Sequence, residues 1–259
     1  MYHNIHSDFI LTPILNILEE SANACCGVGE GIETQPLCEY IMQSTFLKMT
    51  GASEQKMKCI CWNLATNDFK YRYDYLSNCK NYGECSDYNS KKMVYSDMIE
   101  QIVKLEDSFD VKKLISDKNV FLSEIKGHIC DCINNTPMEI WQQSDYMFFM
   151  ENLGNMLPNQ ICCDNGNGKK GKRKGKSNDN SHLFGNELRN DYDLVVYHHR
   201  NRCAHNLTSY QENLPSLKEL VKEEYRYKNY FYRYYILVVI DEIFMLLFKK
   251  YMAVYEVKW

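Results

Sequence analysis

The chain has 259 residues, and 45% of them are hydrophobic, which is enough to bury the core of one large domain or two small ones. Its formal net charge is −4 at pH 7, whereas nucleic-acid-binding domains often carry a basic surface. Proline (5) and glycine (12) are scarce, and long periodic segments fill most of the sequence. These features predict an all-α fold, with residues 1–259 forming a single helical domain.

The first predicted helices are bounded by prolines and glycines. Thr12 as N-cap and Pro13 as first residue begin a helix that the glycine cluster 27–31 ends. Pro36 begins a long helix that reaches about Thr66. Its apolar stripe recurs in steps of three and four residues, at Phe46, Met49, Ser53, Met57, Ile60 and Leu64. The small residues 50–53 would let another helix approach this one closely.

The next segments predict a loop and three more helices. The composition of residues 76–90 is that of a loop, and helical patterns follow at 93–106 and 111–133. The sequence "TPME" at 136–139 matches a capping box with proline at the first helical position. It predicts a helix from Pro137 to about Leu153.

The C-terminal region predicts one long closing helix over about 216–255. Its apolar run 235–255 carries Asp241 and Glu242 in the middle, so it holds no uncharged stretch long enough for a membrane span. We therefore expect a buried core helix and no membrane association.

The twelve cysteines suggest reduced thiols. The start "MYHNIHSDFI" lacks the basic and apolar regions of a signal peptide, so we expect a cytoplasmic protein. Eight of the cysteines lie in close pairs, Cys25/Cys26, Cys59/Cys61, Cys130/Cys132 and Cys162/Cys163. This spacing is shorter than structural zinc sites use, so we expect no metal and no cofactor. A zinc- or redox-dependent cysteine protein is a further alternative, which rests on the cysteine count alone.

Residues 159–183 are predicted to form a flexible basic loop inserted before the next helix. Six of the eight residues from 169 to 176 are basic: Lys169, Lys170, Lys172, Arg173, Lys174 and Lys176. Such a tract can bind RNA phosphates without sequence preference. It can equally be a solvated loop without a partner.

The stretch "VVYHHRNRCAHNL" at 195–207 concentrates polar groups within a helical pattern. Its predicted buried stripe runs through Tyr192, Val196, His199, Cys203 and Leu207. Asn201 and His205 are one turn apart on another face, and Arg200 lies at the edge of the stripe, where its long side chain can reach solvent. A helix with such residues on its solvent side is also common in proteins that have no site there.

The hexad "RNRCAH" at 200–205 resembles the Arg-x4-6-His motif of the HEPN superfamily. The upstream segment "GASEQKMK" at 51–58 resembles the HEPN helix whose acidic or polar residue faces that motif, which makes Glu54 a possible supporting residue. The resemblance implies a helical bundle, usually a homodimer, in which two motif helices form a composite ribonuclease cleft. Many members are toxins or antiviral effectors, so an antitoxin or a defence-complex partner is implied as well.

The residue types of the hexad suit metal-independent RNA cleavage, because RNA carries its own nucleophile, the 2′-OH. His205 can act as general base or acid, and Arg200 can bind the phosphate and its developing charge. Asn201 can orient the imidazole or bind the ribose, and Arg202 is either a further phosphate contact or a solvated residue. The alternative is a catalytically silent HEPN module that binds RNA, a nucleotide or a protein partner.

Overall fold

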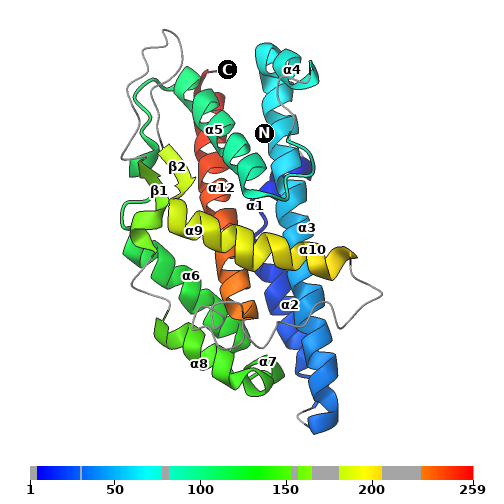
Figure 1. Cartoon of the computed structure of the whole chain (residues 1–259). Helices are drawn as coiled ribbons and strands as arrows, with labels where there is room; N and C mark the ends of the chain where they lie inside the picture. Colours follow the sequence, from blue (N-terminus) through cyan, green and yellow to red (C-terminus); the bar gives the residue numbers. More distant parts are fainter. Residues whose placement is uncertain are drawn as a thin grey trace.

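The computed structural model describes residues 5–29, 31–77, 82–152, 157–164, 181–205 and 229–258. The predicted all-α class is confirmed, since one two-stranded sheet accompanies the helices of these ranges (Figure 1). The helices of the first half are α1 (Ile5–Leu11), α2 (Leu15–Cys25), α3 (Gln35–Asn67), α4 (Phe69–Leu76) and α5 (Tyr88–Leu105). Those of the second half are α6 (Lys118–Ile133), α7 (Pro137–Trp141), α8 (Gln143–Asn152), α9 (Asn186–Asp191), α10 (His198–His205) and α12 (Tyr230–Lys258). The single-turn elements are η1 (Ile32–Thr34), η2 (Val111–Lys113) and η3 (Pro158–Gln160).

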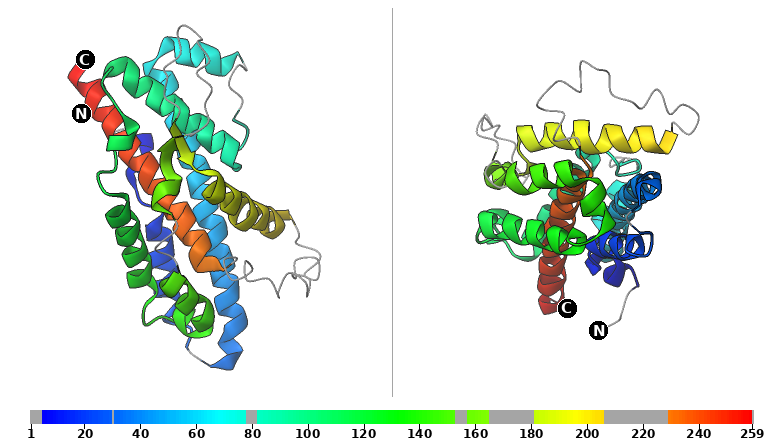
Figure 2. Two further views of the ribbon diagram at one scale, coloured as in Figure 1. Left: turned by 60° about the vertical axis from the view of Figure 1, so that its left-hand side comes forward. Right: turned by 90° about the horizontal axis from the view of Figure 1, so that it is seen from below.

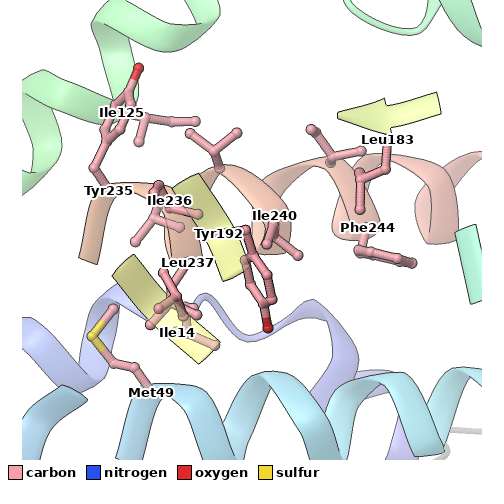
Figure 3. Packing of buried hydrophobic residues seen from close by; sticks show 14 of the residues in the cluster. Ile14, Met49, Ile125, Leu183, Tyr192, Tyr235, Ile236, Leu237, Ile240 and Phe244 are labelled. Carbon is pink, nitrogen blue, oxygen red and sulfur yellow. The ribbon is translucent and has the colours of Figure 1, made fainter. Parts of the chain in front are cut away.

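Helix α12 lies at the centre of the bundle and confirms the predicted buried C-terminal helix. Every residue from Phe231 to Asp241 is buried, so this part of the helix is covered on all sides. It packs against α1, α3, α5, α6 and α8, and Figure 3 shows its side chains Ile236, Leu237 and Ile240 within this core. None of the helices in the described ranges has the length and apolar content that crossing a membrane requires.

Helix α3 matches the predicted long helix closely. It contains Pro36 in its first turn, and all six residues of the predicted stripe are buried. Helices α1 and α4, on the other hand, were not predicted. Helix α4 begins directly after Asp68, whose carboxylate accepts a hydrogen bond from the Tyr71 N–H at 3.0 Å and so caps the new helix.

Two predicted helix starts are wrong in detail. The Thr12 hydroxyl donates to the Asp8 carbonyl at the end of α1, so Thr12 does not cap α2, which begins two residues after Pro13. The predicted helix 137–153 is divided at Gln142 into α7 and α8. The capping box does not form there, because the Thr136 hydroxyl donates to the Ile133 carbonyl at 2.6 Å instead of accepting from the new helix.

The ends of the predicted loop 159–183 form a small antiparallel sheet, which corrects that prediction. Strand β1 (Ile161–Asp164) pairs with β2 (Ser181–Phe184), with Ile161 opposite Phe184. Ile161, Leu183 and Phe184 are buried, so apolar side chains at both ends of the segment hold it to the bundle. The basic tract 169–176 between the strands lies outside the described residues.

Helix α9, the segment η4 (Tyr192–Tyr197) and helix α10 form one continuous rod. The rod lies across one side of the bundle, and its α10 end extends past α3 (Figures 1 and 2). It contacts α5 and α12 through η4 and contacts α3 through α10. The predicted motif helix therefore crosses α3, the helix that carries Glu54. Residues 206–228, where the closing helix was predicted to begin, lie outside the described ranges.

Candidate functional site

A π-helical turn, η4, precedes the motif residues and sets their direction. It spans six residues, and three of them, Tyr192, Val195 and Val196, are buried. The regular spacing predicted the burial of Tyr192 and Val196 but not that of Val195. The buried Arg233 of α12 donates from Nε to the Val195 carbonyl at 3.0 Å, which fixes this turn to the core. π-helical turns are rare and are frequently found at functional sites.

Arg200 is fixed by two side-chain acceptors. Its Nη2 donates to Oε2 of Glu54 in α3 at 3.2 Å, and its Nη1 donates to Oδ1 of Asn201, also at 3.2 Å. The exposed fractions of the Arg200 and Glu54 side chains are only 24% and 12%, so most of the Arg200 side chain is covered and does not extend into solvent. Glu54, the possible supporting residue, thus contacts the motif arginine. Asn201 contacts the guanidinium, and its predicted roles, orienting the imidazole or binding the ribose, stay predictions.

A second cation, Lys91 of α5, lies in the same cluster and was not predicted. It is fully buried, and its Nζ donates to the Cys85 carbonyl at 2.8 Å and to Oγ of Ser53 at 3.4 Å. Burial lowers the pKa of Lys91 to about 8, although Glu54 opposes that shift. Cys85 has a positive φ of 58°, a backbone conformation that is uncommon for residues other than glycine. Nothing in the sequence around Lys91 signals these partners, because they come from α3 and from a turn.

The cluster is closed by Tyr192. Its hydroxyl donates to the Ser86 carbonyl at 2.6 Å, which ties the motif rod to the turn before α5. Thr50, Glu54, Lys91, Tyr192, Val196 and Arg200 line this cluster, and the space between them is too small for a water molecule. The cluster is therefore a packed polar core beneath the motif helix.

His199 faces the core, as its spacing predicted. Its ring lies 5.2 Å from the Phe46 ring, and its Nε2 is 3.2 Å from the Tyr230 hydroxyl. Burial, together with Arg233 and Arg202, lowers the pKa of His199 to about 2. The ring is therefore neutral at physiological pH. Arg202, another candidate site residue, is exposed. Its Nη2 lies 3.5 Å from Nδ1 of His199.

The structure brings together Arg200, Asn201 and Glu54. Helix α10 ends at His205, whose side chain lies outside the described set. The predicted RNA-binding residues of the basic tract, Lys169, Lys170, Lys172, Arg173, Lys174 and Lys176, are outside it as well.

Comparisons of the chain with models of protein families, with curated proteins and with solved structures find no match. The chemistry of the cluster is the remaining guide to function. A planar guanidinium held by a carboxylate and an amide is pre-oriented, and guanidinium groups bind phosphate oxygens in a fixed geometry. Because the Arg200 side chain keeps about a quarter of its surface exposed, the cluster can present a cation to an anionic ligand.

Proposed function

We propose that this chain is a metal-independent endoribonuclease of the HEPN type that acts as a toxin or antiviral effector. One observation carries the proposal: the arginine of "RNRCAH" pairs with an acidic residue of the helix that the resemblance expects to face the motif. The arginine and the acidic residue are 146 positions apart in the sequence, so the contact is a property of the fold and not of the local motif.

The proposed mechanism needs one proton-transfer group and one cation. His205 removes the proton of the 2′-OH or returns one to the leaving 5′-oxygen, while Arg200 binds the phosphate charge that grows in the transition state. Glu54 and Asn201 position the guanidinium. Two copies of the chain, meeting at their α10 ends, would supply a separate acid and base. An antitoxin or a larger defence complex in the cytoplasm would restrain or recruit the dimer.

The test is cleavage of total RNA by the purified protein in EDTA, with mapping of the new ends. We expect 2′,3′-cyclic phosphate and 5′-OH ends, and we expect Arg200→Ala and His205→Ala each to slow cleavage by about a hundredfold or more. His198→Ala is the matched control, because His198 is an exposed histidine of the same helix. Near-normal cleavage by both site variants at a normal melting temperature would show that the assignment is wrong.

A conservative variant separates the chemical role of Arg200 from its structural one. Arg200→Lys keeps a cation beside Glu54 but loses the planar pair of donors that holds Glu54 and Asn201 together and that would present a fixed geometry to a phosphate. We expect this variant to unfold at a temperature close to that of the wild type and to cleave RNA far more slowly.

A second candidate function has its own observation. Both Nη atoms of Arg200 donate within the chain, above a cluster that has no room for water. These contacts favour a catalytically silent module in which Arg200 stabilises the bundle and binds RNA, a nucleotide or a protein. Wild-type protein that binds RNA but produces no new ends would identify this second function.

A further inference from the structure

Helix α4 exposes an apolar face that the bundle does not cover. Phe69, Tyr73 and Leu76 are 76%, 66% and 72% exposed, and their spacing of four and three residues places them on one side of the helix. The opposite side carries the buried Tyr71. Trp62, near the end of α3, is 63% exposed as well. Single exposed rings are ordinary, but a row of them at one end of the molecule indicates a contact surface.

Cations alternate with these rings. Lys70 and Arg72 are exposed on α4, and the Arg72 guanidinium lies 5.6 Å from the centre of the Phe69 ring. The acidic residue of the same helix, Asp74, is half-buried. Alternating rings and cations are what proteins use to bind single-stranded nucleic acid, because the rings stack on unpaired bases and the cations attract the backbone phosphates.

A row of residues on α3 connects this surface with the Arg200 cluster. Glu54, Lys58 and Trp62 follow one another at intervals of four, so they lie along one side of α3. The helical rise places Trp62 about 12 Å from Glu54 along the axis. Helix α4 then begins at the end of α3, beyond the point where α10 crosses (Figure 1). Lys58 in this row is 38% exposed and pairs with Glu84.

We infer that Trp62, Phe69, Lys70, Arg72 and Tyr73 form a binding surface for single-stranded RNA, which we call the α4 platform. The rings hold unpaired bases, and the strand continues along α3 toward Arg200. That the ligand is RNA rests on the proposed function. The RNA must be single-stranded, because the bases of a duplex are already stacked on one another and cannot stack on the rings.

The experiment measures the fluorescence anisotropy of a labelled oligouridylate 12-mer with the full-length His205→Ala protein, so that cleavage does not interfere. Each base–ring stack contributes at least about fivefold to affinity, so we expect the Phe69→Ala/Tyr73→Ala variant to raise Kd at least about 20-fold. Lys70→Ser/Arg72→Ser should lower the slope of log K against log salt by about 1.4. The control is Tyr40→Ala, since Tyr40 is a 67% exposed ring in the first half of α3. It should bind like the parent.

Several results would overturn the α4 platform. One is an unchanged Kd for the Phe69→Ala/Tyr73→Ala variant, and another is equal affinity for an RNA duplex of the same length. A third is reversible self-association that this variant abolishes without any change in RNA affinity, because the surface would then bind a second copy of the chain.

The proposed function is tested separately. RNA cleavage by the wild type together with unchanged binding by the platform variant would reject only the platform. Binding through α4 without any new RNA ends would reject only the nuclease.

Discussion

Two neighbouring residues of the motif helix have opposite environments. His199 is enclosed by the Phe46 and Tyr230 rings, and burial keeps it neutral. Arg200 reaches across to α3 and pairs with Glu54. One turn of helix thus carries a histidine with a packing role and an arginine available for charge chemistry. If the chain is a ribonuclease, His205 and not His199 must move the proton.

The low pKa of His199 gives a testable pH dependence. Because the folded-state pKa is about 2 and the ordinary value is 6.5, the unfolded chain binds a proton that the folded chain does not once the pH falls below about 6.5. The free energy of unfolding should therefore fall with decreasing pH, by up to about 1.4 kcal/mol per pH unit from this group. Urea unfolding between pH 7 and pH 4 measures it.

The comparison variant is His199→Phe, which lacks the titrating group but keeps a ring between Phe46 and Tyr230. Its stability should fall less steeply toward acid than that of the wild type, so the difference between the two proteins should change steadily below about pH 6.5. His198→Phe, at an exposed position of the same helix, should follow the wild type. Parallel pH profiles for His199→Phe and the wild type would contradict the burial argument.

At the scale of elements, the motif rod joins two regular helices through the π-helical turn η4. The extra residue of such a turn lets two contacts form at once, one from its first residue and one from the helix that follows it. Tyr192 bonds to Ser86, and Arg200 bonds to Glu54. A regular helix of the same sequence would turn these two side chains to different relative directions. The π-helical turn is therefore the element that sets the geometry of the cluster.

Changing the length of the turn at Leu194 tests this directly, because Leu194 is a 55% exposed residue within it. Deleting Leu194 removes the extra residue, so the rod becomes a regular helix whose two ends keep nearly the same relative direction, and we expect RNA cleavage to be kept. Inserting one alanine after Leu194 should instead rotate one end of the rod by about 100° relative to the other. The protein then cannot keep both contacts, so we expect RNA cleavage to be lost while the helical content by circular dichroism is kept. Leu194→Ala, with no change of register, should remain active. Full activity of the insertion variant would show that the relative direction of the two ends is not needed.

The elements that the sequence predicted best are those with a long buried stripe. Helix α3 and helix α12 bury many apolar residues, so the helical spacing of these residues is visible in the sequence. Helix α4 has no such signal, since Phe69, Tyr73 and Leu76 point away from the core. The pairing of β1 with β2 spans the basic tract, and the local sequence contains no signal for it. Of the site, Glu54 was expected only as a possible supporting residue, and it contacts Arg200. Lys91 was not predicted, because its partners come from distant segments.

At the scale of the whole molecule, a buried ion pair joins three helices. The side chains of Lys56 in α3 and Asp241 in α12 are 2% and 1% exposed, and Nζ of Lys56 lies 2.6 Å from Oδ1 of Asp241. The other oxygen of Asp241 accepts from the Ile14 N–H at 2.9 Å, so α12 caps the first turn of α2. Burial lowers the pKa of Lys56 and raises that of Asp241. Asp241 thus connects residues that are 185 and 227 positions away from it in the chain.

Breaking this pair on one side should be costly. Asp241→Asn keeps an acceptor for Ile14 but leaves the Lys56 charge buried, so we expect a loss of about 3–5 kcal/mol in the free energy of unfolding. The double variant Lys56→Met/Asp241→Asn also removes the unpaired Lys56 charge, so it should recover most of the lost free energy of unfolding. Denaturant unfolding of the three proteins measures both steps. A double variant as unstable as the single one would show that the charge is not the cause.

The central position of α12 also has a consequence for the order in which the chain acquires its structure. Synthesis proceeds from the N-terminus, so α1, α3, α5 and α6 emerge before α12, the helix that packs against them. In the same way, α2 lacks its capping carboxylate until residue 241 has been made. Contacts this distant in sequence form slowly, and partly made chains expose apolar surface to chaperones and proteases. A copy cut short before α12 therefore cannot assemble the packed Arg200 cluster, so any function of this cluster depends on complete translation.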